Sequence, residues 1–214
     1  MKKVIAVLIF SFLFFFFIMS DVSAQKYLFY MHGKIVEDQG KQAVSPYFGA
    51  YQYEAILDTF RSHHFTVMSE VRKPNTDVTT YAREIKVQVD NLLLKGIPAK
   101  DITVVGASKG AIIAMLVSYY LQNSDVNFVF LAACNDDNFE SFPDIKFYGN
   151  ILSIYERSDD IGNTCARFKK ASSATIRHYK EVEINTGLKH GFLFQPLSEW
   201  INPAIKWANG DYRQ

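Results

Sequence analysis

The chain has 214 residues, of which 49% are hydrophobic and 15% aromatic, and its formal net charge is +1. This length is enough for one domain with a sizeable core. The near balance of basic and acidic residues argues against nucleic acids and anionic membrane surfaces as main partners.

The first 24 residues have the layout of a secretory signal peptide. Two lysines precede an apolar run over residues 4–19, and the small residues of a Val-Ser-Ala sequence end at Ala24. We expect cleavage after Ala24, export to the periplasm or the exterior, and a mature domain over residues 25–214 with no stable membrane partner. In the alternative, residues 4–19 stay in place and tether the protein to a membrane.

Short apolar runs alternate with amphipathic stretches along the rest of the chain, which is typical of an α/β domain with a mostly parallel sheet. The clearest helix begins after Asp77, whose side chain can cap it, and ends before Gly96. In the last helix, Pro203 predicts a kink or a restart with Asn202 as the cap. The expected strands are residues 27–31, 65–71, 102–105, 127–131, 151–155 and 178–184, and the expected helices are residues 47–63, 77–95, 109–121 and 196–207.

The most informative motif lies between the third strand and the third helix, where Gly106, Ser108 and Gly110 form a Gly-x-Ser-x-Gly pattern. A β-branched run precedes this pattern and an apolar run follows it, which is the context of a nucleophile elbow. The turn is so tight that bulky side chains do not fit two positions from the serine, and glycine meets that demand. The alternative is a strand–turn–helix junction whose glycines serve packing only.

With this motif, the chain from Tyr27 to Trp207 resembles the α/β-hydrolase superfamily, in which serine, acid and histidine follow successive strands in that order. The resemblance implies a three-layer α/β-hydrolase fold with a mostly parallel sheet of about six strands flanked by helices. The two N-terminal strands of the family are trimmed, because the mature chain starts almost directly at Tyr27.

A serine hydroxyl needs a base to accept its proton. Of the five histidines, His63 and His64 are expected at a solvated helix end, His178 on an exposed strand face, and His32 in a separate His-Gly motif. His190 lies in the loop between the last strand and the last helix, where the superfamily places its base. The resemblance therefore implies that His190 is the catalytic base.

In the superfamily the acid follows about four residues beyond the end of the strand before the histidine loop's strand, here residues 151–155, so the resemblance favours Asp159. Asp160 and Glu156 are alternatives in the same loop. Asp136 and Asp137 are a further alternative, because some relatives carry the acid one strand earlier.

The oxyanion hole requires two backbone N–H groups that point at one position. One is expected from Lys109, after the nucleophile, and the other from Lys34, after a His-Gly sequence that resembles the oxyanion motif of the superfamily. The superfamily usually has small or apolar residues at both positions. We therefore ask whether the two ammonium groups attract anionic substrates.

The chain has two cysteines, Cys134 and Cys165, which are expected in loops at the active-site edge of the sheet. A disulfide is plausible in an oxidising compartment and would brace the loop that carries Asp159. The alternative is two separate buried thiols.

These features together predict an exported serine hydrolase that cleaves an ester-type acyl bond of a small-molecule substrate through an acyl-enzyme on Ser108. No cofactor or metal ion is expected. The absence of a long insertion between residues 131 and 148 predicts an open site. Alternatives are a thioesterase, amidase or peptidase of the same superfamily, or a non-catalytic secreted binding domain on the same scaffold.

Overall fold

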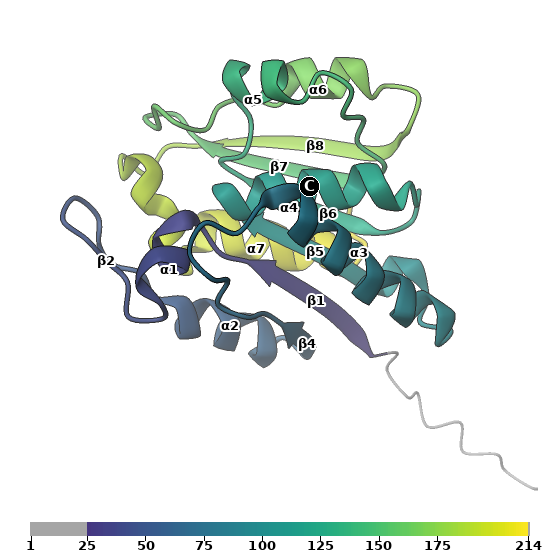
Figure 1. Ribbon diagram of the computed structural model, residues 1–214, viewed down its shortest axis with the longest axis horizontal. Helices are drawn as coiled ribbons and strands as arrows, with labels where there is room; N and C mark the ends of the chain where they lie inside the picture. The colour runs from purple at the N-terminus through teal and green to yellow at the C-terminus, as the bar shows by residue number, and fades with distance from the viewer. Residues whose placement is uncertain (1–24, 214) are drawn as a thin grey trace, which may run out of the picture.

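The computed structural model describes residues 25–213 and shows a central sheet covered by helices on both faces (Figure 1). The strands are β1 (Lys26–Met31), β2 (Val44–Ser45), β3 (Gly49–Ala50), β4 (Phe65–Met68), β5 (Ile102–Ala107), β6 (Asn127–Leu131), β7 (Gly149–Glu156) and β8 (Ile176–Ile184). The helices are α1 (Lys34–Gln39), α2 (Tyr53–Ser62), α3 (Val78–Leu94), α4 (Lys109–Leu121), α5 (Asp136–Ser141), α6 (Ala166–Ala171) and α7 (Ser198–Ala208), with 3₁₀ helices η1 (Ala99–Asp101) and η2 (Lys189–Phe194).

The main sheet has six strands in the order β4-β1-β5-β6-β7-β8, and every neighbouring pair is parallel. Parallel strands present their carboxyl ends at one edge of the sheet. The loops that follow β1, β5, β7 and β8 therefore meet at the same edge. The predicted sheet of about six parallel strands is confirmed.

Alternate residues of each strand face two separate apolar cores, as the two-residue period of a strand dictates. In β1, Leu28 and Tyr30 pack with α2 and α7, whereas Phe29 and Met31 pack with α3 and α4. Because both faces are covered, the central strands β5 and β6 are buried along their whole length. This arrangement gives the three layers expected of the fold.

The structure corrects several element boundaries. The helix expected at 47–63 begins only at Tyr53, because Pro46 and Gly49, the latter with φ of 77°, belong to a hairpin formed by β2 and β3. The strand expected at 65–71 ends at Met68. The short helices α1, α5 and α6 have six residues each, too few to produce a periodic apolar pattern.

Two expectations about helix ends have different outcomes. The Asp77 side chain accepts a hydrogen bond from the Thr80 N–H at 2.8 Å, so the predicted cap of α3 is confirmed. Helix α7, in contrast, continues through Pro203, so of the two alternatives at that proline the restart with Asn202 as the cap is wrong.

The predicted signal peptide, residues 1–24, lies outside the described residues, and its cleavage stays a prediction. Among residues 25–213, no helix is both long and apolar enough to cross a membrane.

Candidate active site

Ser108 lies at the tight turn between β5 and α4, with φ of 53° and ψ of −121°. A Cβ atom at Gly106 would come within 2.3 Å of the Gly110 carbonyl oxygen, and one at Gly110 within 2.1 Å of the Met31 carbonyl oxygen. Both positions therefore require glycine so that α4 can start directly against the ends of β5 and β1. The Gly-x-Ser-x-Gly pattern thus forms a strained strand–turn–helix junction with the serine at its apex.

His190 lies in η2, after β8, and joins the serine to a carboxylate. Its Nε2 atom is 2.9 Å from Ser108 Oγ, and its Nδ1 atom is 2.7 Å from Asp159 Oδ2. In the tautomer whose Nδ1 carries the ring proton, Nδ1 donates to the Asp159 carboxylate, and Nε2 is free to accept a proton from the serine. The structure thus brings together the serine, histidine and aspartate that the sequence analysis favoured.

The aspartates considered for the acid differ in burial and in their contacts. Asp159 is 4% exposed, and its second oxygen accepts a hydrogen bond from the Ile161 N–H at 3.0 Å. Asp160 is exposed and lies 3.4 Å from the Lys189 ammonium group. Asp136 and Asp137 are exposed on α5, and Asp136 pairs with Arg167 of α6.

Glu156 is fully buried and connects the acid loop to the histidine loop. Its carboxylate accepts hydrogen bonds from the main-chain N–H and hydroxyl groups of both Ser158 and Thr186. Burial acts to raise the pKa of Glu156, but these hydrogen bonds outweigh it and lower the pKa. Glu156 is therefore a positioning residue for both loops, a role that its place at the end of a strand did not reveal.

A disulfide between Cys134 and Cys165 fastens the acid loop to the end of β6. In the same place the Asn163 N–H donates to the Cys134 carbonyl oxygen at 2.6 Å. A Cβ atom at Gly162 would lie 2.5 Å from the Ala132 Cα, so the loop contacts β6 closely there. The disulfide is the alternative that the structure supports, and it braces the segment that carries Asp159.

Lys34 and Lys109 are the first residues of α1 and α4, where main-chain N–H groups have no acceptor within the helix. A Cβ atom at Gly33 would lie 3.5 Å from Ser108 Cβ, so the turn before Lys34 borders the nucleophile. The two residues expected to supply the oxyanion hole therefore belong to segments that border Ser108.

The side chains of these two lysines are both paired with carboxylates. Lys34 Nζ contacts Asp38 at 2.6 Å on the surface, and Lys109 Nζ contacts the buried Glu37 at 2.6 Å. Neither ammonium is an isolated charge, so the structure gives no support to the idea that they attract anionic substrates.

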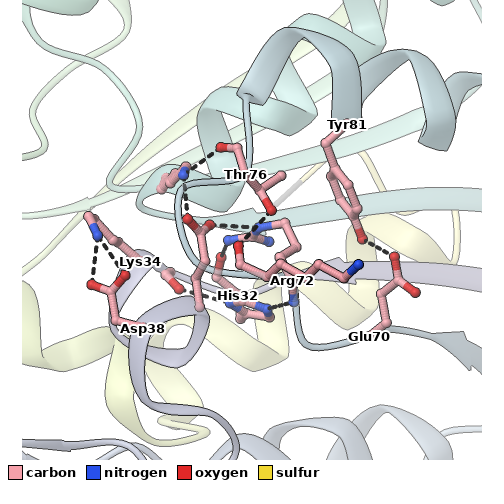
Figure 2. Close-up of polar contacts among 11 residues, drawn as sticks. His32, Lys34, Asp38, Glu70, Arg72, Thr76 and Tyr81 are labelled. Atoms are coloured by element: carbon pink, nitrogen blue, oxygen red, sulfur yellow. Dashed lines mark hydrogen bonds and ion pairs between the residues drawn. The ribbon is translucent and has the colours of Figure 1, made fainter.

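His32 belongs to a buried polar cluster beneath the turn at Gly33, which we call the oxyanion turn because Lys34, an expected oxyanion donor, follows it (Figure 2). Its Nδ1 atom contacts the Gly33 carbonyl oxygen at 2.8 Å, and its Nε2 atom accepts the Arg72 main-chain N–H at 3.1 Å. Burial and the nearby Arg72 charge lower the pKa of His32 to about 4. His32 is therefore a neutral structural residue at neutral pH.

Four exposed apolar side chains, which we call the apolar rim, lie on the hairpin beside His190 and on the two loops that carry Asp159 and His190. They are Tyr47 and Phe48 of the β2–β3 hairpin, Ile161 of the acid loop and Leu188 of the histidine loop, whose exposed fractions range from 37% to 87%. A Cβ atom at Gly191 would lie 2.7 Å from the Phe48 ring, so the hairpin packs directly beside His190. In Figure 1 the hairpin projects from the same end of the molecule as α1.

Within residues 25–213, no cluster of three or more histidine, cysteine, aspartate or glutamate side chains is arranged to hold a metal ion.

No protein-family model matches the chain, and no curated protein sequence is similar to it. Solved structures match it well in shape. SOBER1 of Arabidopsis thaliana is 11% identical, with 88% of this chain and 99% of that one covered and a TM-score of 0.57. The esterase PE8 is 13% identical, with 87% and 93% covered and a TM-score of 0.58. A protein of unknown function from Agrobacterium tumefaciens that is assigned to the α/β hydrolases is 15% identical, with 88% of each chain covered and a TM-score of 0.57.

The chain therefore has the α/β-hydrolase fold, as its resemblance to that superfamily predicts. Identities this low establish the fold alone, so the chemistry must be argued from the site.

Proposed function

We propose that the protein is an exported serine hydrolase that cleaves ester bonds through an acyl-enzyme. The observation that carries the proposal is the continuous chain from Ser108 Oγ through both ring nitrogens of His190 to Asp159, with contacts of 2.9 and 2.7 Å. A protein that only binds a ligand has no need to keep these three side chains in hydrogen-bonding contact with one another.

In the proposed reaction, Ser108 Oγ attacks the ester carbonyl carbon while His190 Nε2 accepts the hydroxyl proton. The oxygen that becomes negative is bound by the main-chain N–H groups of Lys34 and Lys109. His190 then donates its proton to the leaving alcohol, and the acyl group remains on the serine. Water, deprotonated by the same imidazole, releases the acid and restores Ser108. Asp159 keeps the Nδ1 proton in place and stabilises the imidazolium that forms in each half-reaction.

Export is supported by the leader-like sequence of residues 1–24 and by the disulfide, which persists in oxidising compartments. The apolar rim supports substrates with an apolar acyl or alcohol part, because such a group would cover the exposed side chains of Tyr47 and Phe48. The small-molecule ester is therefore expected to have an apolar rather than an anionic character.

The proposal is tested by labelling with a fluorophosphonate probe. The wild type should be labelled, and Ser108→Ala, which removes only the hydroxyl, should not. Labelling of both proteins to the same extent would exclude Ser108 as the nucleophile. A wild type that is not labelled and hydrolyses no ester would favour the non-catalytic binding domain.

A panel of p-nitrophenyl esters, thioesters and anilides then distinguishes an esterase from a thioesterase or amidase. We expect kcat/KM to rise from the acetyl to the octanoyl ester in the wild type. The rise should be smaller in Phe48→Ser, because that variant lacks the rim side chain next to Gly191.

A further inference from the structure

The side chain of Lys109, the residue after the nucleophile, reaches away from the reaction site into a buried ion cluster. Its Nζ atom donates to Glu37 Oε1 at 2.6 Å and to the Thr76 carbonyl oxygen at 2.7 Å. Glu37 lies on α1, the helix that begins with the other expected oxyanion donor, Lys34. One side chain therefore connects the two segments that form the oxyanion hole.

Arg72 completes the cluster from the loop after β4. Its Nε atom donates to Glu37 Oε2 at 3.1 Å, and its Nη2 atom donates to the carbonyl oxygen of His32, two residues before Lys34. Figure 2 shows Arg72 between His32 and Tyr81, with the Lys34–Asp38 pair apart from it. The guanidinium thus holds both ends of the turn that carries the donor.

The cluster is unusually well sheltered for charged groups. The side chains of Arg72 and Glu37 are at most 1% exposed, and that of Lys109 is 18% exposed. Burial acts to raise the pKa of Glu37, but hydrogen bonds from Lys109 and Arg72 outweigh it and lower the pKa. The carboxylate is therefore ionised and holds two cations in fixed positions, because a buried charge that loses its partner is strongly destabilised.

We propose that the Lys109–Glu37–Arg72 cluster is a brace that sets the position of both oxyanion donors, with the Lys109 side chain as a positioning group for the reaction. The inference rests on the proposed serine hydrolase function. Lysine, unlike a small or apolar residue at this position, is long enough to reach α1 from the first turn of α4. Its side chain can therefore fix the positions of the two donor segments relative to each other.

The brace is tested with Lys109→Met, which keeps the main-chain donor and most of the aliphatic side chain but removes the ammonium group. We expect kcat for p-nitrophenyl butyrate to fall by about 10–100-fold, the size of effect that a small misplacement of catalytic groups produces. KM should change little, because the donors bind the oxygen more strongly in the transition state than in the bound ester.

A second measurement separates positioning from general loss of structure. Phenylboronic acid forms a tetrahedral anionic adduct on a catalytic serine and thus reports on the oxyanion hole. Its inhibition constant should rise in Lys109→Met in parallel with the fall in kcat/KM. Lys109→Arg, which can still pair with Glu37, should recover a large part of both.

The matched control is Lys86→Met, because Lys86 forms a similarly short pair with Asp90 on α3, outside the site. It should keep the wild-type kcat and boronate affinity.

If Lys109→Met is folded and also keeps the wild-type kcat and boronate affinity, the brace is excluded while the serine hydrolase function stands. If Lys109→Met unfolds, Lys109→Arg decides: wild-type kcat and boronate affinity support the brace, and loss of both in a folded protein excludes it. A wild type without fluorophosphonate labelling would overturn the proposed function and the brace together.

Discussion

Two adjacent aspartates follow β7, and their side chains have opposite surroundings. Asp159 is buried against His190 Nδ1, whereas Asp160 is exposed next to the Lys189 ammonium group. This contrast separates a residue that orients the imidazole from one that only adds surface charge.

We therefore expect Asp159→Asn to lower kcat by about 10³–10⁴-fold with little change in KM, because an amide donor at this place favours the wrong imidazole tautomer. Asp160→Asn is the matched control and should retain most of the turnover. The measurement is steady-state kinetics of both variants on one ester. If Asp159→Asn keeps more than about a tenth of the wild-type turnover, another carboxylate orients His190.

For individual residues, the sequence revealed the side chains that react but not the side chains that hold them in position. Ser108 and His190 have local signatures, a glycine pair and a loop position, and Asp159 follows a recognisable strand. Glu37 and Arg72 are 35 residues apart, and nothing near either of them predicts that they meet. The only available signal was the unusual lysine at position 109.

Among the secondary-structure elements, the loop that carries Asp159 depends on its covalent link to the end of β6. The disulfide joins cysteines 31 residues apart, and both are almost fully buried. Closing a loop of this length restricts the unfolded chain and stabilises the fold by about 3–4 kcal/mol in the chain-entropy model.

We expect Cys134→Ala/Cys165→Ala to lose about that much stability in urea unfolding. It should also lose turnover, because the acid loop is then held by hydrogen bonds alone. Addition of a reductant should destabilise the wild type but not the double variant. Two free thiols in the unfolded, unreduced wild type would contradict this prediction.

The elements that the sequence failed to predict are those with few residues and weak patterns. The long strands and helices were recognisable because apolar residues recur at a fixed period over many positions, as in α3. The β2–β3 hairpin pairs only two residues in each strand, so no alternation develops. Its packing on Gly191 depends on Phe48 meeting a loop more than 140 residues later in the chain, which no local pattern encodes.

For the molecule as a whole, the buried groups beneath the oxyanion turn link stability to pH. His32 is held neutral in the folded state, with its pKa lowered from 6.5 to about 4 by burial and by Arg72. Between these two values the unfolded chain binds a proton that the folded protein does not. Stability is therefore fully present above pH 6.5 and falls as the pH is lowered towards 4.

Glu37 adds to this loss in a lower pH range. Its pKa is lowered from 4.5 in the folded protein by its two basic partners, whose hydrogen bonds outweigh the opposing effect of burial. The stability it contributes is present above its unfolded pKa and is lost as the pH falls through the folded value. Both groups therefore make the protein less stable in acid.

Each unit of pKa difference corresponds to about 1.36 kcal/mol, so His32 alone should account for roughly 3 kcal/mol of stability lost between pH 6.5 and 4.

We expect His32→Asn to be less stable than the wild type at pH 7.5, because the hydrogen bond from the Arg72 N–H is weakened. The variant should nevertheless lose less stability than the wild type between pH 7.5 and 4.5. The measurement is urea unfolding at a series of pH values. His64 is exposed at the end of α2, so His64→Asn should keep the pH dependence of the wild type. Equal pH dependence in His32→Asn and the wild type would mean that His32 is not the group whose protonation destabilises the fold.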